Sequence, residues 1–511
     1  MGSEKRIVNR RRDILVILLS LLVTLTAAAE DSLHPMGCRR GKSRPSTVLR
    51  RGQHPPEQCG GDFYHGTRHQ LVVLTSFKDR LFGGNERATL EQWEKIFNAP
   101  NLSEAPFYGS IHDYFYAQSY GDFDVVFDLQ YVQLADSCKK YRSTLTEDEN
   151  SQYMVDEALD VLLTRDVDWS LYDWNGDGYI NQLLFVYAGK GSSYGGFGGD
   201  TNSIWPHQWR LSEHLNLMTA EPNDYRDARS FDSDGVTYTV DVYCAVQERD
   251  SKNGYGSFGT ICHEYTHCFG FPDFYDGSTK YVGKWDLMDY GNMAGDGFCP
   301  TSYSAHERWM MGWLTPIELT EPVTVTDIPP LSEEGRAYLI RNDDYPNEYY
   351  IVENRQRSQF DAQLPGTGVT IFHIDYDESL WTSYYMMPNN PNRLHYSIFP
   401  ANNKASTYYL SDWAYPYQDN ISLTDSSLPP AQLWHPRSDN IFMMSKPLTN
   451  IAVNSDGLAS FDFMKEPSAI QIVDGSAVQT QRWYDLLGRQ LPDHPLQKGL
   501  YFYYGRKIVV R

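Results

Sequence analysis

Long apolar runs are nearly absent from this chain of 511 residues. Beyond one run near the amino terminus, no stretch is long and apolar enough to cross a membrane, so we expect no transmembrane segment in the mature protein. Basic charge is also scarce. The formal net charge is −22, and residues 1–55 hold 11 Lys and Arg against 4 Asp and Glu, so residues 56–511 carry −29. This acidic body argues against a nucleic-acid partner and suits an extracellular protein that binds Ca²⁺.

Cysteine is scarce as well, with seven in the whole chain. In an exported protein they permit disulfides, but an odd number leaves at least one unpaired, and the spacing does not define the pairing. Export is predicted by residues 1–29, which have the parts of a signal peptide: basic residues up to Arg12, an apolar run over Ile14–Leu25 and small residues at Ala27–Ala29. We therefore expect a protein that is secreted or held at a bacterial cell surface.

The strongest chemical signal is His263-Glu264 followed by His267. Histidines four residues apart stand on one face of a helix, about one turn apart, where they can hold a single metal ion. Glu264 stands beside them and is the candidate catalytic residue, a general base that takes a proton from a water at the metal. The alternative is a chance match, in which both histidines are ordinary helix residues.

The residues after this motif supply a candidate third ligand. Gly270 suits the left-handed position that ends a helix, and the turn that follows can bring Asp273 back to the same ion. The spacing predicts a zinc hydrolase with His263, His267 and Asp273 as zinc ligands. Glu307 is the alternative third ligand, because a later helix supplies a Glu in thermolysin-like enzymes.

A loop rich in Asp and Gly matches the first nine positions of an EF-hand calcium loop. Gly178 stands at position six, where the loop turns sharply, but position twelve is Leu184 instead of Glu, and a strand is expected over Gln182–Ala188. We therefore predict a structural Ca²⁺ site that is EF-like without being an EF-hand, with a metal-free Asx/Gly turn as the alternative. The candidate ligands are Asp173, Asn175, Asp177, Tyr179 and Asn181.

A second turn after the histidine pair carries Met288. It would form an apolar base beneath the metal ligands, as the Met-turn of metzincins does, although filling of the core is the alternative. Tyr290 is a candidate transition-state stabiliser, with a packed turn tyrosine as the alternative. Cys262 and Cys268 flank the histidines, and we expect them to be buried helix residues instead of metal ligands.

Apolar periodicity predicts an α+β catalytic domain over residues 69–315 and an all-β, sandwich-like domain over residues 316–465. In the second domain we expect His373 and Asp375 on a solvated strand face. The expected elements of the first domain are a strand at His69–Phe77, helices at Thr89–Asn98, Ser110–Ser119 and Glu149–Arg165, and strands at Gln182–Ala188 and Thr237–Val246. Those of the second are strands at Tyr349–Glu353, Gly368–Asp375 and Leu458–Phe463.

Eight short motifs follow one another along the chain. They are Tyr187-Ala188-Gly189 after the calcium-like loop, Ile204–Trp209, His263–Asp276, Trp285–Met288, Gly312–Pro316, Tyr349–Gln356, Leu364–Gly368 and Pro447–Ile451. In this order they resemble the immune inhibitor A family of secreted zinc metallopeptidases, and the resemblance runs from about His69 to Met464.

The resemblance implies a metzincin-like fold, zinc held by His263 and His267, and Glu264 as the general base. It also implies Asp273 as the third ligand, where many metzincins have His. One departure follows Gly191, because this chain has two serines where the family often has an acidic residue. If that acid binds calcium, one calcium site is weaker here or built differently.

The two ends of the chain carry signals of their own. Residues 30–68 indicate a pro-segment, with a disordered linker as the alternative; Cys38 would cap the zinc in a latent form and Arg50-Arg51 would be a processing site. Residues 466–511 resemble the C-terminal sorting tails of the type IX secretion system, with an extra strand pair as the alternative. Both ends predict export machinery as a partner.

Together these features predict a zinc metalloendopeptidase that hydrolyses peptide bonds in proteins or peptides. One alternative is a secreted or surface binding module with a degenerate protease site. The other is a zinc amidase or esterase that uses the same chemistry on another substrate.

Overall fold

The computed structural model describes most of the chain between residues 63 and 465, together with four short strands near the carboxyl terminus. The described residues up to Met464 form one compact unit, and those from Lys465 onward form a second. The signal peptide, Cys38 and Arg50-Arg51 lie outside the described residues. These are 63–142, 150–193, 200, 202–211, 228–249, 258–276, 279–381, 388–465, 483–484, 490–491, 499–503 and 506–510.

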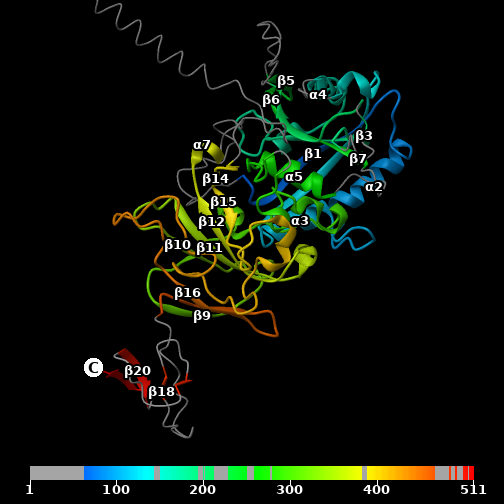
Figure 1. Ribbon diagram of the computed structural model, residues 1–511. Helices are drawn as coiled ribbons and strands as arrows, with labels where there is room; N and C mark the ends of the chain where they lie inside the picture. The colour runs from blue at the N-terminus through cyan, green and yellow to red at the C-terminus, as the bar shows by residue number, and fades with distance from the viewer. Residues whose placement is uncertain are drawn as a thin grey trace, which may run out of the picture. The chain divides into compact units, whose positions relative to one another are not determined.

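The first unit mixes helices and strands, and its first half is built on a five-stranded sheet with the order β2-β1-β3-β7-β4 (Figure 1). The first four are parallel and β4 runs antiparallel at the edge. The central strands are continuous apolar runs, as expected where both faces of a parallel sheet are covered. The strands are β1 (Gly66–Ser76), β2 (Phe123–Gln133), β3 (Leu183–Lys190), β4 (His207–Arg210) and β7 (Val242–Arg249).

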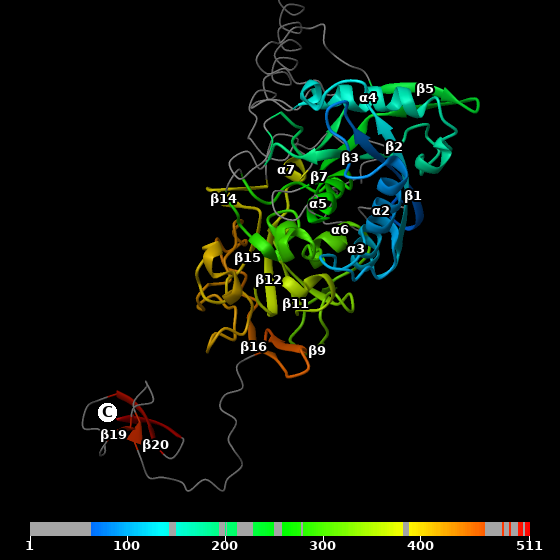
Figure 2. The ribbon, with the colours of Figure 1, turned by 90° about the vertical axis from the view of Figure 1, so that its right-hand side faces the viewer.

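Helices cover both faces of this sheet (Figures 1 and 2). Alternate side chains of one strand point to opposite faces, so Val72 and Leu74 join a cluster with α2, α3 and α5, whereas Leu71 and Val73 pack with α4. Among the described residues no helix is long and apolar enough to cross a membrane. The helices are α2 (Glu86–Asn98), α3 (Ile111–Gln118), α4 (Asn150–Leu162), α5 (Phe258–Cys268) and α6 (Ala305–Met310).

Local sequence explains where these helices begin. The side chain of Asn85 accepts the backbone N–H of Ala88 at the start of α2. Ser110 and Asp113 form a reciprocal capping box at the start of α3.

One predicted strand was wrong in extent. Thr237–Val246 is divided at Asp241 into β6 (Val236–Val240), which pairs with β5 (Arg229–Ser233), and β7 of the main sheet. The carboxylate of Asp241 lies 3.1 Å from the Arg210 guanidinium, so a buried ion pair occupies the break. Alternating apolar residues on both sides of Asp241 hid this change of sheet.

The second half of the first unit is rich in strands. One sheet has the order β15-β12-β11-β10-β8 and another the order β16-β17-β9. Its elements are β8 (Ile317–Glu318), β9 (Val323–Ile328), β10 (Ala337–Arg341), β11 (Glu348–Arg355), β12 (Gly368–Asp375), α7 (Glu378–Trp381), β13 (Asn389–Asn390), β14 (Arg393–Leu394), β15 (Tyr396–Ile398), β16 (Leu448–Val453) and β17 (Ala459–Phe463). Apolar residues of β10, β11 and β12 belong to the same cluster as α5, so the two halves share a core.

The predicted solvated face of β12 was wrong. His373 is 6% exposed and Asp375 is 1% exposed. The His373 ring lies 2.7 Å from the Glu348 carboxylate, and Asp375 pairs with His395 and His435. Both faces of β12 are covered, and its polar side chains are compensated by charged partners from distant segments, which strand alternation does not reveal.

In the second unit the described strands form one antiparallel sheet with the order β19-β18-β20-β21. They are β18 (Trp483–Tyr484), β19 (Gln490–Leu491), β20 (Gly499–Tyr503) and β21 (Arg506–Val510).

Candidate metal centre

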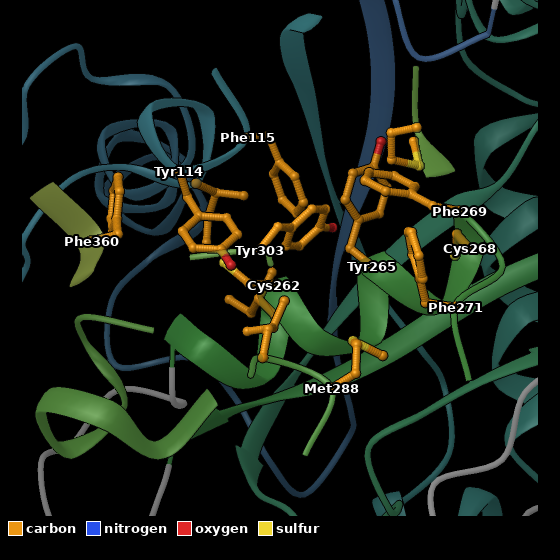
Figure 3. Packing of buried hydrophobic residues seen from close by; sticks show 14 of the residues in the cluster. Tyr114, Phe115, Cys262, Tyr265, Cys268, Phe269, Phe271, Met288, Tyr303 and Phe360 are labelled. Atoms are coloured by element: carbon orange, nitrogen blue, oxygen red, sulfur yellow. The ribbon is translucent and has the colours of Figure 1, made fainter. Parts of the chain in front are cut away.

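Helix α5 is fixed in the core by its apolar and aromatic side chains. Figure 3 shows Cys262, Tyr265 and Cys268 in an aromatic cluster, and all three are buried. The Tyr265 hydroxyl donates to the Gln70 side chain on β1 at 3.0 Å. At the start of the helix only glycine fits, because a Cβ on Gly259 would lie 1.9 Å from the Asn292 carbonyl oxygen.

Three candidate ligands meet at the end of this helix. His263, His267 and Asp273 are buried, and their potential ligand atoms all lie within 4.8 Å of one another. Oδ1 of Asp273 lies 3.1 Å from Nε2 of His263 and 3.3 Å from Nε2 of His267. Gly270, at φ +94°, takes the left-handed conformation that turns the chain back after the helix. The structure thus brings together the three residues that the spacing predicted.

The outer nitrogens of both imidazoles are held by the backbone. Nδ1 of His263 lies 3.1 Å from the Leu287 carbonyl oxygen, and Nδ1 of His267 lies 2.7 Å from that of Phe271. A carbonyl oxygen only accepts, so each Nδ1 carries a proton, and Nε2 is the nitrogen left to offer a lone pair to a metal ion. This arrangement fixes both tautomers in the form that binds a metal through Nε2.

The inner atoms fit a cation. Nε2 of His267 and Oδ1 of Asp273 are buried and make no hydrogen bond with the described residues. Buried polar atoms without partners are costly, and a metal ion held by two nitrogens and one carboxylate oxygen would compensate them. Two neutral imidazoles and a carboxylate are the ligand types that zinc takes in catalytic sites.

Electrostatics without a metal show how strongly the three groups act on one another. Burial lowers the pKa of His263, but the Asp273 carboxylate raises it by more, to about 8. Burial raises the pKa of Asp273, but the imidazoles of His267 and His263 lower it by more, to well below its usual range. The carboxylate is therefore ionised, as a metal ligand has to be.

The Met288 turn contacts the segments that carry the candidate ligands. Met288 is fully buried, and its carbonyl oxygen accepts the backbone N–H of Phe274, the residue after Asp273. The preceding residue, Leu287, supplies the carbonyl that holds His263. This turn therefore positions two of the three candidate ligands through backbone contacts.

Two buried carboxylates hold this turn, and the sequence analysis did not identify them. Oδ1 of Asp286 accepts the Met288 N–H at 2.8 Å, and its Oδ2 accepts the hydroxyl of Tyr396 on β15 at 2.7 Å. Oδ2 of Asp289 accepts the backbone N–H groups of residues 281–283 at 2.7–2.8 Å. Burial raises the pKa of Asp286 and of Asp289. In the sequence, the placing of Asp286 and Asp289 on either side of Met288 was the signal that could have identified them.

The remaining candidate residues are not part of the group that could hold a metal. Glu264 is 3% exposed on α5, next to His263, whereas Tyr290 is 41% exposed. Glu307 forms the capping box of α6 with Ser304 and is not part of the group that could hold a metal.

The calcium-like loop is compact and uses its acidic side chains within itself. The Asp173 carboxylate accepts the N–H of Asp177 at 3.1 Å and that of Gly178 at 2.8 Å. Asp177 accepts the N–H of Tyr179 at 2.9 Å, and Asn181 accepts that of Trp174 at 2.8 Å. The loop has the Asx turns of a metal loop, and calcium there stays a prediction.

Comparison with known proteins points to the region around this centre. Residues 97–314 match the family model described as immune inhibitor A peptidase M6, catalytic domain. Immune inhibitor A from Bacillus thuringiensis subsp. alesti is 31% identical over 172 residues, which are 30% of this chain and 22% of that protein. Pre-pro-metalloprotease PrtV from two strains of Vibrio cholerae serotype O1 is 28% identical over 179 residues, 31% of this chain and 18% of that protein.

The chain therefore spans about a fifth of the length of the curated relatives that it matches. The matched family region includes α5, Asp273 and the Met288 turn. Over residues 97–314 the chain is similar to the catalytic domain of the immune inhibitor A metallopeptidases.

Proposed function

We propose that this protein is a secreted zinc metalloendopeptidase. His263, His267 and Asp273 hold the zinc ion, and Glu264 is the general base. The observation that carries the proposal is that three buried atoms able to bind a metal lie within 4.8 Å of one another. Two of these atoms have no hydrogen bond with the described residues. The match of this region to a peptidase catalytic domain supports the same conclusion.

The residues of the chain divide the work of peptide hydrolysis. When bound, zinc supplies Lewis-acid polarisation of the peptide carbonyl and lowers the pKa of water. Glu264 accepts the proton of the attacking water and passes it to the leaving nitrogen. The carbonyls of Leu287 and Phe271 keep His263 and His267 in the tautomer that binds through Nε2.

The proposal extends to the parts that frame this centre. Residues 69–315 are the catalytic domain, of metzincin-like fold, and residues 316–465 are a sandwich-like β domain. The hydroxyl of Tyr396 reaches Asp286, so the β domain supports the Met288 turn. Calcium binds at Asp173, Asn175, Asp177, Tyr179 and Asn181.

Export and activation belong to the same proposal. Residues 1–29 are a signal peptide, and residues 466–511 are a sorting tail for type IX secretion. A pro-segment lies within residues 30–68 and ends before β1, which begins at Gly66. The printed name of the Vibrio relative, a pre-pro-metalloprotease, supports a precursor that is processed. Proteins or peptides outside the cell are the substrates.

Glu264→Gln tests the proposal, because the amide keeps the size of the side chain and removes its ability to accept a proton. We expect zinc content to stay at one ion per chain while the rate of casein cleavage falls by about 10²–10⁴-fold. Tyr290→Phe is the companion variant: a smaller loss of kcat would assign the transition-state role to Tyr290.

Casein cleavage by the Glu264→Gln variant at the parent rate would refute the catalytic assignment. Zinc binding without cleavage of any protein by the parent would favour a binding module. Release of ammonia from amides, without cleavage of a mixed peptide library, would favour an amidase.

A further inference from the structure

Near the candidate metal centre lies a lysine, Lys280, whose ammonium group contacts aromatic rings. Lys280 is partly buried and forms no salt bridge or hydrogen bond with the described residues. Its Nζ lies 3.7 Å from the centre of the Tyr275 ring and 5.5 Å from that of Tyr290. Lys95, Lys140 and Lys446 each have a carboxylate within 4 Å. Lys280 differs from these three lysines, although not from Lys284, in having no such carboxylate among the described residues.

The aromatic ring beneath Lys280 connects it to the metal centre. The rings of Tyr275 and His263 are stacked, with centroids 6.3 Å apart and an angle of 24° between their planes. Because Nζ of Lys280 lies 3.7 Å from the centre of the Tyr275 ring, it lies at most 10.0 Å from the centre of the His263 ring. That separation suits contact with a substrate side chain close to the cleaved bond, not with the metal itself.

The loop that carries Lys280 is fixed on both sides. Before it, Asp276 and Thr279 pair through two backbone hydrogen bonds of 3.0 and 2.8 Å. After it, the Asp289 carboxylate accepts three successive backbone N–H groups, beginning with that of Tyr281. The backbone on both sides of Lys280 is therefore held by the fold.

The charged groups around Lys280 would allow its ammonium group to bind a further carboxylate. Burial lowers the pKa of Lys280, and the carboxylates of Asp289 and Asp273 partly offset this by raising it. Asp273 faces the two histidines and Asp289 holds the loop, so neither is placed as an ion-pair partner for Lys280. The cation–π contact with Tyr275 compensates part of the lost hydration, but the ammonium group has three N–H donors to satisfy.

We propose that Lys280 is a specificity-determining residue that binds an acidic side chain of the substrate, within two residues of the cleaved bond. Tyr275 and Tyr290 hold the ammonium group from its sides, and the Asp or Glu carboxylate of the peptide completes its coordination. This inference rests on the proposed peptidase activity. It explains a positive group at the active site of a chain whose net charge is strongly negative.

The test uses amidated peptides that differ only in Glu or Gln at each of the two positions on either side of the cleaved bond. At one position we expect the parent to prefer Glu in kcat/KM by about fivefold or more. Lys280→Met keeps the apolar stem and should abolish the preference; Lys280→Glu should reverse it, and Lys280→Arg should restore it. Lys284→Met is the matched control, because Lys284 lies 5.9 Å from the same Tyr290 ring.

Zinc content and Tm of each variant separate a loss of charge from a loss of folding. A parent without preference at any position, or an unchanged preference in Lys280→Met, would overturn the inference while leaving peptidase activity in place. An inactive parent, or Glu264→Gln as active as the parent, would instead overturn the proposed function.

Discussion

Two loops of this protein carry acidic residues at the spacing of metal sites, and their side chains are used in opposite ways. Around α5, both Nδ1 atoms contact backbone carbonyl oxygens. Of the candidate ligand atoms, Nε2 of His267 and Oδ1 of Asp273 make no hydrogen bond within the part of the chain that the structure describes. In the calcium-like loop, both carboxylate oxygens of Asp173 accept backbone N–H groups. The first site is preorganised for an ion, whereas the second is already stabilised by its own turns.

The two loops differ in whether their polar groups have hydrogen-bond partners when no metal is bound. At the first site two buried polar atoms have no hydrogen-bond partner among the described residues, so a metal ion is the simplest compensation. An exposed Asx loop satisfies its backbone whether or not calcium binds. Variants in the two loops should therefore differ most in metal content and least in folding.

The largest effect is expected from Asp273→Ala. Loss of a ligand that contacts the ion should weaken zinc binding by more than the roughly 10–100-fold seen for residues that only support a ligand. Peptidase activity should fall with zinc occupancy, because the remaining imidazoles hold the ion with one ligand fewer. Chelator competition measures the affinity, and metal analysis measures the occupancy.

Asp173→Ala is the matched control for this variant, and it should leave zinc occupancy unchanged. Full zinc occupancy in Asp273→Ala would move the third-ligand assignment to another residue. Glu307 would then be examined first, despite its capping role in α6.

A smaller effect is expected from Asp173→Ala on stability. The substitution removes the acceptor for two backbone N–H groups, so we expect a loss of about 1–3 kcal/mol in the free energy of unfolding. If calcium binds this loop, added Ca²⁺ should raise the Tm of the parent and not that of the variant. Equal shifts in both proteins would contradict a calcium site at this loop.

How far the sequence predicted these sites follows from the distance over which each signal acts. The candidate ligands at positions 263, 267 and 273 lie on one helix and its turn, so their spacing was sufficient to predict that they meet. Asp286 was not identified, because its role depends on Tyr396, 110 residues further along the chain. The predicted exposure of His373 and Asp375 failed for the same reason, since Glu348, His395 and His435 reach them through tertiary packing.

Secondary structure was likewise predicted where the signal lies within one short stretch of the chain. The expected strand at His69–Phe77 corresponds to β1, and the expected helix at Glu149–Arg165 corresponds to α4. The apolar stripe of α4 packs into one buried cluster, and the continuous apolar run of β1 packs into a cluster on each face of the sheet. The expected strand at Thr237–Val246 failed where the chain leaves one sheet for another at a buried Asp241, a change that alternation cannot record.

The smallest effect, and the finest test of the comparison, is expected from alanine at the glycines that shape the two loops. Gly270 and Gly176 both have positive φ, +94° and +70°, so alanine at either position should cost about 1–2 kcal/mol in the free energy of unfolding. Only Gly270 lies between the candidate ligands His267 and Asp273, so only Gly270→Ala should also weaken zinc binding. Chelator competition and urea unfolding separate the two effects. Similar losses of zinc affinity in both variants would mean that the turn after α5 acts through general stability, and that Asp273 is not positioned by the conformation of Gly270.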